Sequence, residues 1–157
     1  GLRVLSEERE TLSEYEKLLA DAHLRPRART KLGRKLLESG VEAAIDTSDG
    51  LIADLKKLCF ASGVTATIDW TRIPVHPALT DLFPEEWSNL VLDGGEEYEL
   101  IFTAAIPIVE RLLSEYSEEL NVIGEITSGE AGTVHVINKS VGEMDLKHTG
   151  WDHFRTS

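Results

Sequence analysis

Apolar residues recur at helical spacing over four stretches of the chain, and each stretch carries a signal for the start or the end of a helix. In the first stretch, Thr11 and Glu14 have the spacing of a capping box. The second and third stretches are each followed by a glycine, which commonly ends a helix, and the fourth begins at a proline, which the first turn tolerates. The sequence therefore predicts helices over residues 6–22, 27–38 and 49–61 and from Pro107 onward.

Short apolar or alternating runs predict strands over residues 41–45, 64–68, 98–104, 121–126 and 133–138. Strands and helices alternate in the middle of the chain, whereas a short turn joins the last two strands like a hairpin. This order favours the α/β (α+β) class, with a mixed β-sheet covered by helices. Because 157 residues are close to the size of one ordinary domain, we expect a single domain over residues 1–157.

The composition narrows the range of partners. Hydrophobic residues make up 41% and charged residues 28% of the chain, as in soluble globular proteins, and no apolar run reaches the ~20 residues of a membrane helix. A net charge of −12 argues against nonspecific binding of nucleic acid, which needs a basic surface. Cys59 is the only cysteine, so no internal disulfide can form and a reducing, cytoplasmic location is expected. We therefore expect neither a membrane nor a nucleic acid as partner.

Positive charge is concentrated in residues 25–35, the basic stretch, which holds 6 of the 16 lysines and arginines. Such a run is usually the solvated face of a helix. It can also face phosphates or an acidic neighbour, and the sequence leaves both interpretations open.

Two aspartates lie three residues apart where the strand predicted over residues 41–45 ends and the next helix begins. This segment, residues 46–50, reads DTSDG and places Ser48 between Asp46 and Asp49. The carboxyl end of a strand is where α/β sheets usually bind ligands. Capping of the helix would explain one serine or one aspartate but not both acids, and a carboxylate after an apolar strand risks burial without a partner. A Mg²⁺ ion held by Asp46 and Asp49 would remove that cost, and the N–H groups of the helix N-terminus favour phosphate.

A second cluster, residues 94–100, reads GGEEYEL and leads into a predicted strand. Its two glycines allow a tight turn or the close approach of another backbone. On a strand, alternation would direct Glu97 and Glu99 to one face and Glu96 and Tyr98 to the other. Glu96 and Glu97 are therefore expected to serve different ends, with one of them facing a cleft.

A third motif near the C-terminus reads GWDHF at residues 150–154. A tryptophan close to a terminus usually packs the tail onto the domain. Trp151 could instead stack on a flat heteroaromatic ligand, with a cation–π contribution if that ring is positively charged. No neighbour in sequence forms a catalytic triad with His153, so we expect a structural role for it.

Together, these three motifs closely resemble the C-terminal half of thiamine-monophosphate kinases. The letters GLRVL at residues 1–5 and VIGEI at residues 122–126 also resemble that family, so the similarity spans essentially the whole chain. The aspartate and Gly-Gly-Glu motifs occur more widely, in the superfamily of aminoimidazole ribonucleotide synthetase and selenophosphate synthetase, and the GWDHF motif selects the kinases within it. The resemblance implies the C-terminal domain fold of this aminoimidazole ribonucleotide synthetase-like superfamily.

The resemblance also implies an activity, the Mg²⁺- and ATP-dependent phosphorylation of thiamine monophosphate to thiamine diphosphate. Asp46 and Asp49 would then bind Mg²⁺, and Ser48 would contact ATP. Glu96 would contact the thiamine part of the substrate, and Trp151 would stack on it. The nucleophile is a phosphate oxygen of the substrate, so we assign no catalytic residue: positioning and electrostatics carry the catalysis.

The chain departs from the family pattern in two ways. Glu97 stands where the family usually has an aspartate, so Glu97 is left out of the predicted site. The N-terminal domain of the family, which supplies much of the ATP site and forms the homodimer, is absent from these 157 residues. We therefore expect the chain to fold but to have little or no activity alone. The alternative functions are a related ATP-dependent synthetase and a noncatalytic binding or assembly module.

Overall fold

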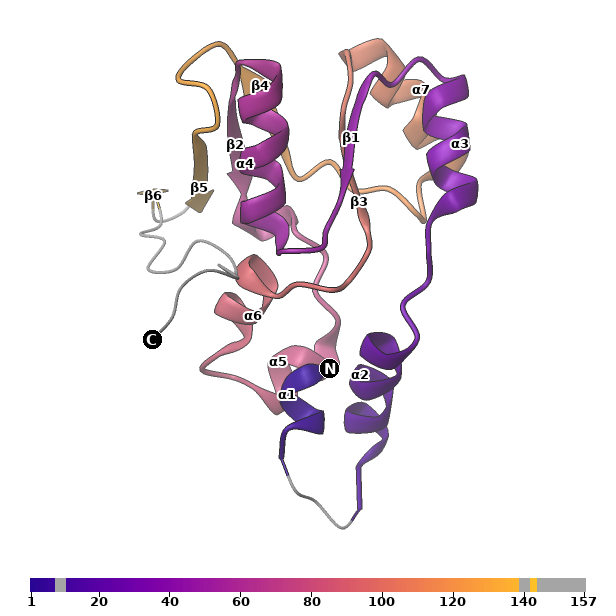
Figure 1. Cartoon of the computed structure of the whole chain (residues 1–157), viewed down its shortest axis with the longest axis vertical. Helices are drawn as coiled ribbons and strands as arrows, with labels where there is room; N and C mark the ends of the chain where they lie inside the picture. The colour runs from indigo at the N-terminus through magenta and orange to yellow at the C-terminus, as the bar shows by residue number, and fades with distance from the viewer. Residues whose placement is uncertain (8–10, 139–141, 144–157) are drawn as a thin grey trace.

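The computed structural model describes residues 1–7, 11–138 and 142–143 (Figure 1). Its helices are α1 (Leu2–Leu5), α2 (Glu14–Leu24), α3 (Thr30–Glu38), α4 (Leu51–Ser62), α5 (Pro77–Leu82), α6 (Trp87–Asp93) and α7 (Ile106–Tyr116), with a 3₁₀ turn η1 at Trp70–Arg72. Its strands are β1 (Ala43–Asp46), β2 (Thr65–Asp69), β3 (Leu100–Thr103), β4 (Gly124–Thr127), β5 (Val134–Asn138) and β6 (Gly142–Glu143). The main elements follow the predicted order, and the α/β class is confirmed.

The described strands divide into two sheets, a division that the sequence did not predict. β1 and β3 make an antiparallel pair in which Asp46 is opposite Leu100. The other sheet is mixed and has the order β4-β2-β5-β6, with β2 antiparallel to β4 and parallel to β5. β4 and β5 follow each other in sequence but do not pair, because β2 lies between them. The predicted hairpin is therefore wrong.

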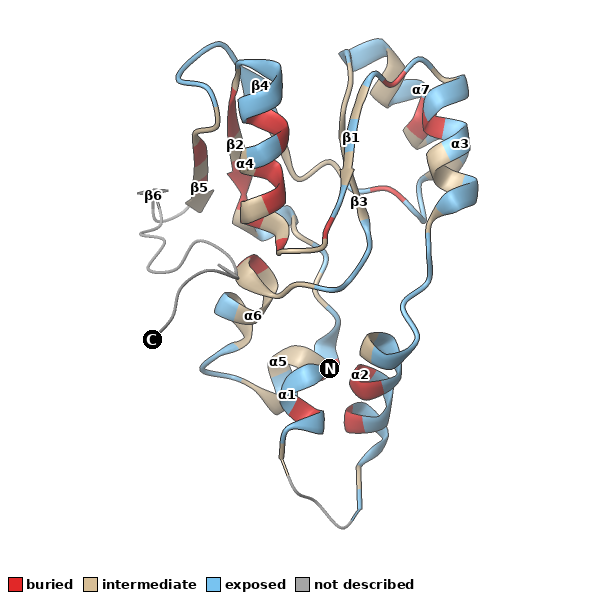
Figure 2. Ribbon diagram, viewed as in Figure 1, coloured by how far each residue is buried: buried red, intermediate tan, exposed pale blue. Residues whose placement is uncertain are grey.

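Three apolar clusters hold these elements together, and Figure 2 shows them as separate groups of buried residues. One joins α3 and α7 to β3 around Leu36 and Leu112, and another joins α1, α2 and α5 around Val4 and Leu19. The largest cluster packs one face of α4 onto the four-stranded sheet. Because α4 follows β1 in the chain, this packing also fixes the position of the N-terminus of α4. The buried members of this cluster are Ile52, Leu55, Leu58, Cys59, Ala66, Ile68, Leu92, Val134 and Val136.

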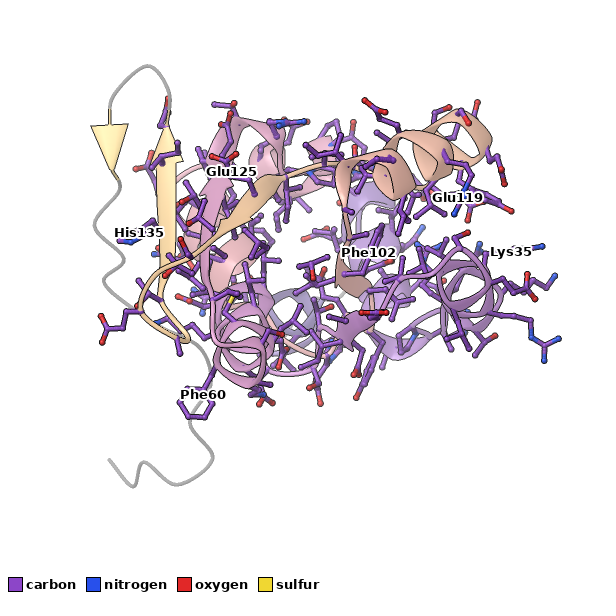
Figure 3. The ribbon with its side chains drawn as sticks, turned by 90° about the horizontal axis from the view of Figure 1, so that it is seen from above. Lys35, Phe60, Phe102, Glu119, Glu125 and His135 are labelled. Carbon is purple, nitrogen blue, oxygen red and sulfur yellow. The ribbon has the colours of Figure 1, made fainter. Side chains whose placement is uncertain are left out.

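The faces of helices that turn away from these clusters are exposed. Phe60 of α4 points away from the sheet and is 73% exposed (Figure 3). Phe102 of β3 instead packs against the cluster that joins α3 and α7. Within the described residues, no helix combines the length and the apolar character needed to cross a membrane.

The helix predicted over residues 6–22 starts later than predicted, at Glu14, and a separate short helix, α1, precedes it at Leu2–Leu5. α1 ends at Leu5, and α2 has Ser13 as its N-cap. The Ser13 hydroxyl accepts the backbone N–H of Glu16 at 3.3 Å, and the Glu16 carboxylate accepts the N–H of Ser13 at 2.7 Å. The letters TLSEYE allow a capping box at either of two positions, and the structure uses the later one rather than Thr11 with Glu14.

Candidate functional site

The structure brings the first two sequence motifs together, although about fifty residues separate them. We call residues 46–50 the first loop and residues 94–99 the second loop. The backbone N–H of Thr47 donates to the carbonyl of Glu99 at 2.9 Å, and the N–H of Tyr98 donates to the carbonyl of Thr47 at 3.0 Å. These bonds continue the β1–β3 pairing beyond the strands. The two loops therefore form one platform.

Close backbone approach requires glycine at two points of the platform, against the end of α6 at Gly50 and against the first loop at Gly95. Gly50 has a φ of 118°, and a Cβ there would lie 2.9 Å from the carbonyl oxygen of Asp93. A Cβ on Gly95 would lie 2.6 Å from the carbonyl oxygen of Ser48, which also accepts the N–H of Glu96 at 2.9 Å. The structure thus supports close backbone approach as the reason for Gly95, one of the two interpretations that the sequence left open.

A residue that the sequence analysis missed holds the first loop in place. Asp54, in the first turn of α4, is fully buried. Its Oδ2 accepts the N–H groups of Ser48 and Asp49, each at 2.8 Å, and of Gly50 at 3.2 Å. The N-cap of α4 is Gly50 without a side-chain cap, so the capping considered for Ser48 or Asp49 does not occur. The sequence suggested that N–H groups at this helix N-terminus would favour phosphate. Since Asp54 uses these three N–H groups, they are not available for that role. The signal in the sequence was an acid on the apolar face of a helix.

Lys57 joins Asp54 to Asp49. Its ammonium donates to Oδ1 of Asp54 at 2.7 Å and to Oδ2 of Asp49. These hydrogen bonds, the one to Asp49 first, raise the pKa of Lys57 above its ordinary value. The side chain of Asp49 is 27% exposed, whereas that of Asp54 is 1% exposed. Asp49 can therefore also face a ligand, and Asp54 cannot.

Asp46 is exposed at the end of β1, so the risk of burial that the preceding apolar strand suggested is not realised. Exposure alternates along β1, and Asp46 falls on the same exposed face as Ala44. A metal ion is thus not needed to offset burial of Asp46. In the parts of the chain that the structure describes, no group of three or more His, Cys, Asp or Glu side chains forms a metal site. Two carboxylates still fit Mg²⁺, because waters and substrate phosphates usually complete its shell.

Side chains of the second loop do not alternate as they would on a strand, so that prediction is wrong. The loop precedes β3, and Glu96 and Tyr98 have φ values of 62° and 54°. Non-glycine residues with positive φ are strained, and such residues cluster at functional sites. Glu99 accepts two hydrogen bonds from Arg29, at 2.8 Å from Nε and 2.6 Å from Nη2, and Oε2 of Glu96 lies 3.7 Å from Nε2 of His23. At Arg29, the basic stretch faces an acidic neighbour.

Glu97 lies between these two acids and is exposed. Even so, desolvation by the surrounding protein raises the pKa of its carboxyl above the ordinary value. Repulsion from Glu99 adds to the shift, and attraction from His23 opposes it. The ionised form of Glu97 is therefore less favourable here than in an unfolded chain.

Both loops line an open hollow of about 2760 Å³ that continues between the two sheets. Closed ligand pockets usually measure roughly 300–1,000 Å³, so this site is one wall of an open face rather than an enclosed pocket. Arg27 and Arg29 of the basic stretch also line the hollow. Trp151 and His153 lie outside the described residues.

Comparison with known proteins defines the class of protein. A model of the family described as AIR synthase related protein, C-terminal domain, matches residues 1–137, and the chain belongs to that family. A solved structure of a hydrogenase maturation protein, HypE, shares the fold at 22% identity and a TM-score of 0.62. At that identity the likeness shows the fold alone.

More similar relatives carry a single name. Thiamine-monophosphate kinase from Leptospira interrogans serogroup Icterohaemorrhagiae serovar Lai is 32% identical over 155 residues, 98% of this chain and 48% of that protein. The protein of the same name from Escherichia coli O157:H7 is 35% identical over 144 residues, 88% of this chain and 43% of that protein. The structure "AaThiL complexed with AMPPCP and TMP" has a TM-score of 0.81 at 30% identity, over 98% of this chain and 46% of that one. These matches confirm the resemblance, and the chain spans about half the length of its relatives.

Proposed function

We propose that this chain is the C-terminal part of a thiamine-monophosphate kinase, which transfers the γ-phosphoryl group of ATP to thiamine monophosphate. The observation that carries the proposal is the joining of the first and second loops into one platform, since it places both motifs of the resemblance side by side. Relatives with this name match nearly the whole chain, and one related structure is named for its complex with AMPPCP and TMP. The nucleophile would be an oxygen of the substrate phosphate, so the chain positions the reactants.

Each predicted site residue has a role in this proposal. Asp46 and Asp49 would hold Mg²⁺ at the first loop, where the ion supplies positive charge that offsets the charge of the phosphates. Ser48, whose backbone N–H and carbonyl are both hydrogen-bonded, would contact ATP through its hydroxyl. Glu96 would contact the thiamine part of the substrate, and Trp151 would stack on it.

The charge balance of the platform supports a metal-dependent reaction. Two cations beside the loops are engaged with acids: Lys57 with Asp49 and Arg29 with Glu99. Phosphate groups that approach the platform would therefore meet a surplus of carboxylates. A divalent cation reverses that local charge, which is what Mg²⁺ would do here.

We propose that the chain needs further protein to turn over substrate. The chain spans about half the length of its relatives, and the hollow beside the loops is open. The family resemblance implies an N-terminal domain and a homodimer, which would close this site. The location that we propose for the whole protein is the cytoplasm. A kinase assay with ATP, Mg²⁺ and thiamine monophosphate is expected to show little activity for the 157-residue chain. Full turnover by this chain alone would contradict the proposal.

Tryptophan fluorescence tests the substrate site. Trp70 and Trp87 stack with ring centroids 5.1 Å apart and planes 25° apart, and they would contribute a background signal. Replacing both by phenylalanine leaves Trp151 as the only tryptophan of the chain. Titration of this variant with thiamine monophosphate and Mg²⁺ is expected to quench its emission, because the substrate would stack on the indole ring.

The matched control keeps Trp70 and Trp87 and carries Trp151→Phe; its emission should not respond. A response of equal size in that control would contradict the stacking role. If neither protein responds, the same titration in the presence of the N-terminal domain decides the question. Quenching of Trp151 emission that appears only with the N-terminal domain supports the proposal. If no quenching appears there either, thiamine monophosphate is not the substrate.

A further inference from the structure

The proposed function assigns no role in metal binding to Lys57. Its ammonium lies between two carboxylates that differ in their freedom to move. Asp54 is buried, and its Oδ2 already accepts three backbone N–H groups, so it cannot turn away. The side chains of Asp49 and Lys57 are 27% and 50% exposed, which leaves both room to change conformation.

We propose that Lys57 is a resident counter-ion of Asp49, which a divalent cation must displace before Asp49 can serve as its ligand. This inference rests on the proposed metal role of Asp49. The ammonium contacts Oδ2 of Asp49, one of the two oxygens that a metal ion would use. After displacement, Lys57 keeps its hydrogen bond of 2.7 Å to Asp54, so it stays at the site and can return.

The charges give the direction of the effect. With Lys57 in place, its ammonium faces the two carboxylates of Asp49 and Asp54; with methionine there, that ammonium is gone. A divalent cation would then be attracted more strongly and would no longer compete with the Lys57 ammonium for Asp49. Lys57→Met should therefore tighten binding of a divalent cation about three- to fivefold, the scale of a half-exposed ion pair. A lysine that only held Asp49 in position for the metal would give the opposite sign.

The test measures metal binding directly and needs no kinase activity. Mn²⁺ serves as the probe, and the electron paramagnetic resonance signal of the free ion reports binding to the 157-residue chain at low ionic strength, without nucleotide. Lys56→Met is the matched control, because it removes the same charge from the neighbouring position of α4. Among the described residues, the Lys56 side chain has no ion pair or hydrogen bond. Thermal unfolding verifies that each variant is folded.

The dissociation constant for Mn²⁺ should fall three- to fivefold in Lys57→Met and less than twofold in Lys56→Met. An unchanged or larger constant in Lys57→Met would overturn the counter-ion role, and so would equal decreases in both variants. Asp49→Asn separates this inference from the proposed function. If Asp49→Asn binds Mn²⁺ as tightly as the unaltered chain, the metal role of Asp49 itself is wrong, and the inference falls with it.

Discussion

The two loops of the platform are fixed in different ways. Buried Asp54 anchors the first loop through hydrogen bonds to its backbone. Asp54 lies on a helix that packs into the largest apolar cluster. The second loop is exposed from Glu96 to Glu99, contains two non-glycine residues with positive φ, and is bonded to the first loop. The first loop therefore acts as a template for the second. Damage to the first loop should spread to the second, whereas damage to the second should stay local.

The largest effect is expected for Asp54→Ala. The change leaves three backbone N–H groups and the ammonium of Lys57 without their shared carboxylate. Loss of these charge-assisted bonds should lower the free energy of unfolding by about 3 kcal/mol. The melting temperature would fall by roughly 10 °C. Thermal unfolding followed by circular dichroism measures the loss.

The same variant tests the direction of dependence between the loops. Hydrogen exchange should rise in residues 46–50 and also in residues 94–99, because the second loop is bonded to the first. Asp81→Ala, at an exposed position of α5, is the control and should leave both loops unchanged. Faster exchange confined to the first loop would contradict the template role.

Gly95→Ala should have the next largest effect. Its Cβ would lie 2.6 Å from the carbonyl oxygen of Ser48, so the second loop must move away from the first. Overpacking of this kind should lower the free energy of unfolding by about 1–3 kcal/mol. Urea unfolding measures it, and hydrogen exchange should rise in residues 94–99 while residues 46–50 stay protected.

Gly33→Ala is a matched control of opposite sign. Gly33 lies inside α3, and a Cβ there would be 3.7 Å from its nearest neighbour, an ordinary contact. Alanine should therefore stabilise the chain by up to about 1 kcal/mol through helix propensity. Equal effects of the two substitutions would contradict the close approach at Gly95.

Local patterns could be predicted from the sequence, and pairings distant in sequence could not. The face of α4 follows from apolar spacing alone, and the position of the first loop follows from its place after β1. The insertion of β2 between β4 and β5 depends on contacts between segments more than fifty residues apart. Periodicity carries no information on which strands pair, so the predicted hairpin was wrong.

The site shows the same limit at the level of single residues. Asp46 and Asp49 were found because two acids follow a strand, but the exposure of Asp46 depends on which face of the two-stranded sheet is covered. Asp54 was missed because an acid in a helix is ordinarily exposed, and three of its partners are backbone N–H groups, which have no signature in the sequence. The metal and substrate roles themselves stay predictions.

A smaller effect is expected for Thr47→Val, which keeps the shape of a buried residue and removes its hydroxyl. Oγ1 of Thr47 accepts the backbone N–H of Glu99 at 3.1 Å. Loss of that bond should cost about 1 kcal/mol in the free energy of unfolding. Thr47→Ser keeps the oxygen, and hydrogen exchange at Glu99 should be faster in the valine variant than in the serine variant. Equal exchange in both would contradict a bond between the loops at this point.

The smallest effect is expected for Glu97→Gln, and its sign depends on pH. The pKa of Glu97 is raised in the folded chain, chiefly by desolvation, so the folded state holds this proton more tightly than the unfolded state does. Stability then decreases as pH rises through the interval between the ordinary value of 4.5 and the raised one, and it stays lower above that interval. Glutamine cannot ionise, so Glu97→Gln should stabilise the chain at pH 7 by less than about 0.5 kcal/mol, as expected for an exposed position.

Urea unfolding at pH 7 and pH 4, with Glu85→Gln as the exposed control, should show a gain in the stability of Glu97→Gln at pH 7 that shrinks at pH 4. A gain of equal size at both pH values would mean that desolvation of the Glu97 carboxylate is not its cause.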